Sequence, residues 1–199
     1  QRDRVQDLGN HFGKVVRLNR DGSVPADNPF IGREDVLPEI WSYGHRNAQG
    51  AASDADGTYY TISHGARGGD EVNRPEAGLN YGWADVSYGT HYSGRSFPTS
   101  VREGTEQPLF YWDPSIAPSG AAFYDGERFP EWRGDLFVGS LKFGLISRLD
   151  MEAGEIVGEE RLMDGEFGRV RDVRVGPDGA IWFATDRSDG GLYRIVPAE

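Results

Sequence analysis

The sequence predicts an all-β fold of the β-propeller class, in which sheets of four antiparallel strands repeat along the chain. Glycine is frequent, at 28 of 199 residues, and aromatic residues make up 12%, which is typical of many short strands joined by tight turns. Turn residues at Gly134 and at Asp178 each precede an apolar run, about 44 positions apart. A repeat of roughly 40–50 residues is the period of a propeller blade, so the chain holds about four blades. An antiparallel sandwich with coincidental turn spacing is the alternative.

The expected strands are short and are separated by turn residues. Asp-Gly steps at 21–22 and 56–57 favour tight turns. In chain order, strands are expected at 14–19, 36–43, 49–54, 57–63, 121–129, 135–142, 144–150, 155–163, 170–179, 180–186 and 191–197. Residues 23–32, 65–96 and 107–120 are expected to be irregular. Long ordered loops often carry function, so the segment 65–96 is a candidate site.

Composition limits the possible partners. The net charge is −11, with 32 acidic against 21 basic residues, which argues against nucleic acid and against anionic membranes. Because no cysteine is present, disulfides, thiolate metal sites and cysteine nucleophiles are excluded. No run approaches 18 apolar residues, so no membrane insertion is expected, and the N-terminus lacks the apolar core of a signal peptide.

The stretch from Tyr43 to Tyr92 concentrates the polar chemistry. Arg46 and Asn47 form a cation–amide pair, and an arginine there could face the anionic end of an organic cofactor. A glycine-rich segment follows, in which carboxylate and amide oxygens of the kind that Ca²⁺ prefers are present. These oxygens belong to Asp70, Glu71 and Asn73, and the aromatic residues Tyr81, Trp83, Tyr88 and Tyr92 come next. The same residues are also ordinary turn signals between strands, which is the alternative interpretation.

Seven motifs, taken together and in this order, resemble a known family. They read GKVVRLNRDGSVPADNPF, EIWSYGHRNAQG, HGARGGDEVN, NYGW, YWDPSIAPSG, GDLFVGSLK and VRDVRVGPDG, and they extend along almost the whole chain. The family is that of the soluble pyrroloquinoline quinone (PQQ) dependent aldose sugar dehydrogenases, also called glucose/sorbosone dehydrogenases. The resemblance implies a six-bladed β-propeller, of which residues 1–199 form a single domain that covers about the C-terminal three to four blades.

The resemblance also implies a cofactor site for PQQ. The residues that match family positions facing PQQ are Arg46, Asn47, Tyr92, Lys142, Arg169 and Arg171, and Trp112 and Ser115 lie in the matching pocket loop. PQQ is a planar tricarboxylate, so several cations and flat surfaces suit it. For one arginine alone, a charge at a strand end in water would be the simpler explanation.

Calcium is the second cofactor that the resemblance implies. Gly65 and Ala66 match a dipeptide whose backbone carbonyls hold the Ca²⁺ of the cofactor, although the family usually has proline where Ala66 stands. Glu71 and Tyr81 match positions of a second, structural Ca²⁺ site.

The catalytic base of the family has no match here. None of the four histidines, His11, His45, His64 and His91, falls at its position, so no catalytic residue is named. The chain is shorter than a full propeller, and we expect a missing N-terminal half or a second chain to complete the ring, because an open ring exposes strand edges. The resemblance suggests a periplasmic or secreted protein.

Three functions follow from these observations. The first is an oxidoreductase that oxidises an aldose sugar at C1 to the lactone with PQQ and calcium. The second is a non-catalytic extracellular binding module, because one fold serves many functions. The third and weakest is a calcium-dependent hydrolase such as a lactonase, which needs acidic ligands converging on a central channel.

Overall fold

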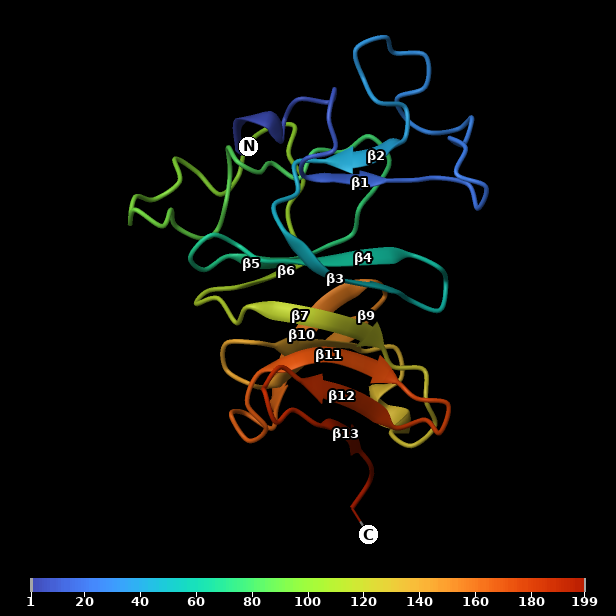
Figure 1. Cartoon of the computed structure of the whole chain (residues 1–199), viewed down its shortest axis with the longest axis vertical. Coiled ribbons are helices and arrows are strands. Elements are labelled where there is room, and N and C mark those ends of the chain that lie inside the picture. The colour runs from blue at the N-terminus through green and yellow to red at the C-terminus, as the bar shows by residue number, and fades with distance from the viewer. Residues whose placement is uncertain (1, 199) are drawn as a thin grey trace.

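Four antiparallel sheets make up the chain, for which the computed structural model describes residues 2–198 (Figure 1). The strands are β1 (Lys14–Val16), β2 (Ile40–Tyr43), β3 (Ala48–Ser53), β4 (Tyr59–Ser63), β5 (Asp70–Asn73), β6 (Phe110–Trp112), β7 (Pro118–Phe123), β8 (Leu136–Ser140), β9 (Ile146–Glu152), β10 (Glu155–Leu162), β11 (Val170–Val175), β12 (Ile181–Thr185) and β13 (Leu192–Ile195). Two short 3-10 helices, η1 (Arg2–Arg4) and η2 (Pro130–Trp132), accompany them. Within residues 2–198, no helix has the length and apolar character needed to cross a membrane.

The sheets are propeller blades that follow one another in chain order. Each sheet is a meander of consecutive strands: β1-β2, then β3 to β6, then β7 to β10, then β11 to β13. Figure 1 shows them stacked along the long axis, with β1 and β2 at one end and β13 at the other. The first strands of neighbouring sheets are in contact, β3 with β7 and β7 with β11. The expected partial β-propeller is therefore confirmed.

One end of the blades brings distant loops together. Since β3, β7 and β11 are the equivalent first strands of successive meanders, they run in the same direction, and their first residues lie at the same end. Two hydrogen bonds mark this end. The His64 ring nitrogen Nε2 donates to the Pro118 carbonyl at 2.6 Å, and the Ser119 hydroxyl donates to the Val170 carbonyl at 2.8 Å. We call it the loop end, defined by the first residues of β3, β7 and β11.

Apolar side chains fill the spaces between the blades. One cluster joins the β3–β6 sheet to the β7–β10 sheet and includes Ile62, Val72, Trp112, Leu136 and Val138. A second cluster joins the β7–β10 sheet to the β11–β13 sheet and includes Tyr124, Phe137, Ile146, Ile181 and Phe183. Burying one such side chain stabilises the fold by roughly 1.5–3 kcal/mol, so these two layers fix how neighbouring blades sit.

Parts of the segments expected to be irregular are strands. Residues 70–73 form β5, which pairs with β4 and β6, and residues 110–112 form β6. Gly68 and Gly69 both have positive φ values, which turn the chain back so that the DEVN run can add to the sheet. The strand β7 begins at Pro118, inside the expected irregular segment 107–120, and proline is tolerated as the first residue of a strand.

Candidate functional site

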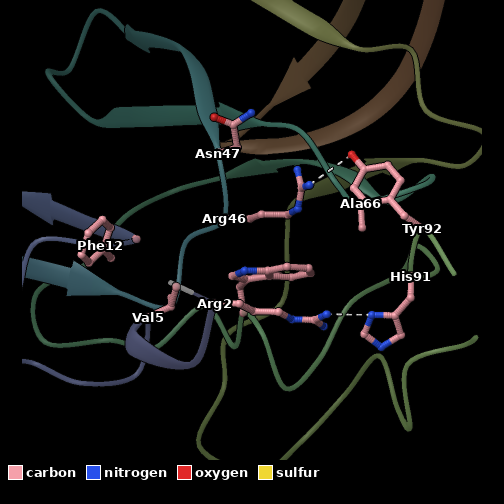
Figure 2. Close-up of a pocket in the computed structure, with 10 residues that line it drawn as sticks. Arg2, Val5, Phe12, Arg46, Asn47, Ala66, His91 and Tyr92 are labelled. Atoms are coloured by element: carbon pink, nitrogen blue, oxygen red, sulfur yellow. Dashed lines mark hydrogen bonds between the residues drawn. The ribbon is translucent and has the colours of Figure 1, made fainter.

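A cavity of about 410 Å³ opens at the N-terminal part of the loop end (Figure 2). Its wall combines the N-terminal segment, the residues just before β3, the loop between β4 and β5, and the loop between β5 and β6. The lining residues are Arg2, Val5, Phe12, Gly13, Arg46, Asn47, Ala66, Trp83, His91 and Tyr92. Four residues predicted for the cofactor and metal sites are therefore together in one cavity: Arg46, Asn47, Ala66 and Tyr92.

Arg46 is the best-held cation in the cavity. It stands just before β3, after Gly44, whose positive φ turns the chain out of β2. One guanidinium nitrogen donates to the His64 carbonyl at 2.9 Å, and another donates to the Tyr92 hydroxyl at 3.3 Å. The guanidinium carbon lies 5.1 Å from the centre of the Trp83 ring. The guanidinium is thus held between two aromatic rings and keeps its positive charge available to a ligand.

The loop of Gly65 and Ala66 presents two backbone carbonyls. Neither carbonyl accepts a hydrogen bond from the described residues, whereas the preceding His64 carbonyl binds Arg46. Unpaired carbonyls of this kind are suitable oxygen ligands for a hard cation. The loop is crowded, because a Cβ atom on Gly65 would meet the Gly68 and Gly69 carbonyl oxygens.

Asp70 was expected to offer carboxylate oxygens to calcium, but its carboxylate is hydrogen-bonded within the protein. Its side chain is fully buried, and its two oxygens accept hydrogen bonds from the Gly65 amide, the Ser115 hydroxyl and the Ala117 amide, at 2.7–2.9 Å. These three donors occupy most of its acceptor capacity, since a carboxylate has about four acceptor positions. Asp70 therefore holds two loops together instead of facing a ligand.

Glu71 and Tyr81, the residues matched to a second metal site, have different partners. Burial raises the pKa of the Glu71 carboxyl to about 7, and its oxygen accepts one hydrogen bond, from the Asn73 amide at 3.1 Å. The Tyr81 hydroxyl accepts from the Glu76 amide and donates to the Arg74 carbonyl. Within residues 2–198, no group of three or more acidic or histidine side chains is arranged to hold a metal ion. The second calcium site thus stays a prediction.

The other three predicted cations lie outside the cavity. Lys142 is exposed, and its side-chain ammonium lies 4.7 Å from the centre of the Phe143 ring. Its backbone amide donates a hydrogen bond to the Ile116 carbonyl. Arg169 donates to the Asp186 carboxylate at 2.9 Å and to the Leu141 carbonyl at 3.4 Å. Arg171 is an exposed residue of β11. All three belong to the loop end, because they follow β8 or begin β11, but the structure does not bring them into contact with Arg46.

The two residues assigned to the pocket loop have structural partners. Trp112 is 2% exposed and packs in the core, where its ring N–H donates to Glu159 at 2.9 Å. Ser115 donates to Asp70.

The histidines have different surroundings. His45 is buried and stacks on the Tyr81 ring. Its Nε2 atom shares a hydrogen bond of 2.8 Å with the Ser42 hydroxyl. Burial and the nearby Lys14 lower the pKa of His45 to about 4. His11 contacts Glu39 on the surface, and His64 donates to Pro118. His91 is the histidine in the cavity wall, and sequence reasoning gave it no role.

Arg2 is a further cavity residue that the sequence did not reveal. It donates to the Nδ1 atom of His91 at 2.8 Å, across 89 positions of sequence. Its guanidinium carbon lies 4.8 Å from the Trp83 ring centre. No local pattern could have paired Arg2 with His91, because only the fold brings them together.

The cavity residues fit a flat organic anion. Organic ligands occupy pockets of roughly 300–1,000 Å³, and this cavity of about 410 Å³ lies in that range. Two guanidinium groups supply positive charge, the exposed Tyr92 ring supplies stacking surface, and the Trp83 ring packs against both guanidinium groups. The Nε atom of Arg46 is buried without a partner among the described residues, so this cavity arginine keeps an unsatisfied donor. The carbonyls of Gly65 and Ala66 fit a hard cation beside it.

Comparisons with known proteins agree with these features. The profile of the glucose/sorbosone dehydrogenases matches residues 1–194. The aldose sugar dehydrogenase YliI of Escherichia coli is 43% identical over 99% of this chain and 54% of its own length. Quinoprotein glucose dehydrogenase B of Acinetobacter calcoaceticus is 28% identical over 95% of this chain and 51% of its own length. The chain thus spans about half the length of these relatives.

Solved structures show the same architecture. A crystal structure of glucose dehydrogenase superposes with a TM-score of 0.95 at 47% identity, covering 100% of this chain and 58% of that one. The PQQ-bound form of aldose sugar dehydrogenase from Streptomyces coelicolor superposes with a TM-score of 0.75 at 27% identity, covering 98% of this chain and 54% of that one. The chain belongs to the glucose/sorbosone dehydrogenase family.

Proposed function

We propose that the chain forms part of a sugar oxidoreductase that uses PQQ and calcium to oxidise an aldose at C1 to the lactone. The observation that carries this proposal is the environment of Arg46, a cation held between Trp83 and Tyr92 in a ligand-sized cavity. Its support from relatives is twofold: the family match, and a relative in the family described as PQQ-bound.

Each cavity residue has a distinct part in this proposal. Arg46 binds a carboxylate of the cofactor, and Asn47 offers an amide beside it. Tyr92 presents an exposed aromatic face against which a flat ring system can stack, while the Trp83 ring packs against Arg46 and holds it in place. The Gly65 and Ala66 carbonyls hold Ca²⁺. Bound PQQ would supply a two-electron acceptor, so that the C1 hydrogen leaves as hydride and the C1 hydroxyl loses its proton.

The proton acceptor for this reaction is not assigned within residues 2–198. His91 accepts a hydrogen bond from Arg2 at Nδ1, so its proton is on Nε2, and taking a second proton would break that contact. His64 donates its Nε2 proton to a carbonyl, and His45 is buried. We propose that the base comes from a missing N-terminal half or from a second chain that completes the propeller, and that the protein acts in the periplasm or outside the cell.

A second candidate is a non-catalytic binding module. One observation favours it: Arg169, expected to face the cofactor, is ion-paired with Asp186 at 2.9 Å. The two candidates differ in their response to PQQ. The intact protein is titrated with PQQ in the presence of Ca²⁺, and glucose is then added while the quinone absorbance is followed. The oxidoreductase predicts saturable binding and loss of the oxidised quinone spectrum, whereas the binding module predicts neither.

A further inference from the structure

Two arginines share one tryptophan in the cavity wall. The guanidinium carbons of Arg2 and Arg46 lie 4.8 Å and 5.1 Å from the centre of the Trp83 ring. Their hydrogen-bond partners are a histidine nitrogen, a backbone carbonyl and a tyrosine hydroxyl, none of which carries negative charge. Both cations line one cavity, and neither forms an ion pair with an acidic side chain among residues 2–198, so an anion in the cavity would gain from their positive charge. The pair also stands out in a chain of net charge −11.

Arg2 is held in place before any ligand arrives. Its guanidinium donates to His91 Nδ1 at 2.8 Å and lies 5.2 Å from the centre of the Phe97 ring, in addition to Trp83. His91 stacks on Phe97 with 4.0 Å between ring centres. Because a guanidinium has five N–H donors, the bond to His91 leaves others free for a ligand. A donor fixed in this way loses little conformational entropy on binding.

Arg2 and Arg46 occupy different depths of the cavity. Arg2 is exposed, whereas the Nε atom of Arg46 has no contact with water. Figure 2 shows the two side chains extending in the same direction, Arg2 toward His91 and Arg46 toward Tyr92. Arg46 is therefore the more buried of the two cations, and Ala66 is partly buried as well, whereas Asn47 is exposed. Arg2 is the more exposed cation of the cavity, so a second ligand could still reach it with a first one bound at Arg46.

We propose that Arg2 binds a carboxylate of the sugar substrate, so that the substrate class includes acidic aldoses such as uronic acids. The identity of the ligand as a sugar rests on the proposed function above. The chemistry itself rests on Arg2: a planar guanidinium with free donors is suited to bidentate contact with a carboxylate. The same chemistry would suit a carboxylate of the cofactor, and the experiment separates these two sources.

The test compares the binding of glucuronate and of glucose to the intact protein, with and without PQQ and Ca²⁺, by the change in tryptophan fluorescence. We expect glucuronate to bind about tenfold more tightly than glucose, because it gains one charge-assisted contact with Arg2. In Arg2→Gln this preference disappears, while the affinity for glucose changes by less than about twofold. Arg2→Lys retains part of the preference, because it keeps the charge without the bidentate geometry.

Arg4→Gln is the matched control. Arg4 lies in the same 3-10 turn and is exposed, but its guanidinium lies over the Phe12 ring and does not line the cavity. We expect this variant to keep the full preference for glucuronate. Thermal unfolding of each variant verifies that it is folded.

Several outcomes decide the matter. Equal binding of glucuronate and glucose by the wild-type protein overturns the proposal. A loss of PQQ affinity in Arg2→Gln, with both sugars weakened alike, also overturns it and makes Arg2 a cofactor contact. If glucuronate preference depends on Arg2 but PQQ does not bind at all, the inference on Arg2 is supported and the proposed oxidoreductase function fails.

Discussion

The hydroxyl of Ser115 donates a hydrogen bond of 2.7 Å to the buried carboxylate of Asp70, 45 positions earlier in the chain. The other contacts of that carboxylate are the backbone amides of Gly65 and Ala117. One side chain of β5 thus ties the loop after β4 to the loop that enters β7. The carbonyls of Gly65 and Ala66, which we propose as calcium ligands, belong to the first of these loops, so their position depends on Asp70.

Replacing Asp70 by alanine should destabilise the fold strongly. The change leaves the Gly65 amide and the Ser115 hydroxyl without this acceptor, and it leaves the Ala117 amide with only the Ser115 hydroxyl, so the expected loss in free energy of unfolding is roughly 3 kcal/mol. Asp70→Asn should cost less, because one amide oxygen remains. Guanidinium chloride unfolding measures both. Asp56→Ala, at an exposed turn position, is the control and should stay close to wild type. A loss below about 1 kcal/mol for Asp70→Ala would contradict the role given to this network.

Arg46 should govern the affinity for the cofactor. Replacing it by glutamine removes a charge-assisted contact and the cation between Trp83 and Tyr92, so we expect PQQ to bind roughly 10- to 100-fold more weakly. Equilibrium dialysis of the intact protein with PQQ in excess Ca²⁺ measures the change. Arg33→Gln is a suitable control, because Arg33 also lies over an aromatic ring, that of Phe30, but not in the cavity. Equal affinities in the two variants would show that Arg46 is no cofactor contact.

Acid should weaken the fold through His45. Burial, followed by the charge of Lys14, lowers the pKa of this imidazole from 6.5 to about 4. Above pH 6.5 both the folded and the unfolded chain hold it neutral, so it has no effect on stability there. As the pH falls from 6.5 to 4, only the unfolded chain takes up the proton. The folded state therefore loses roughly 3 kcal/mol over that interval.

His45→Phe isolates this contribution. Phenylalanine keeps the stacking on Tyr81, leaves the Ser42 hydroxyl without its partner, and cannot titrate. The free energy of unfolding is measured for both proteins at pH 7 and pH 4.5. The variant should lose less stability than wild type on acidification, by roughly 2 kcal/mol, since all other titrating groups are shared. Parallel losses in the two proteins would mean that His45 is not the cause.

The sequence predicts local features of this fold better than distant ones. The blade repeat is visible because turn residues and apolar runs are local signals, and Arg46 and Asn47 are adjacent in a motif. The hydrogen-bonding role of Asp70 is not visible in the sequence, because its partners Ser115 and Ala117 lie 45 and 47 positions away. The pairing of Arg2 with His91 spans 89 positions, so no pattern in the sequence indicates it.

Gly65 should be the glycine of the loop end that is least tolerant of a side chain. A Cβ atom there would meet the carbonyl oxygens of Gly68 and Gly69, and backbone atoms cannot move aside as a flexible side chain does. Gly65→Ala should therefore shift the loop, lower the free energy of unfolding by roughly 1–3 kcal/mol, and weaken the stabilisation by Ca²⁺. Gly158→Ala is the matched control, because its nearest neighbour is the Asp150 Cβ atom at 3.7 Å, an ordinary contact. Thermal unfolding with and without Ca²⁺ measures both effects. If Ca²⁺ raises the unfolding temperature of Gly65→Ala and Gly158→Ala equally, the carbonyls of this loop are not calcium ligands, even where stability itself is lost.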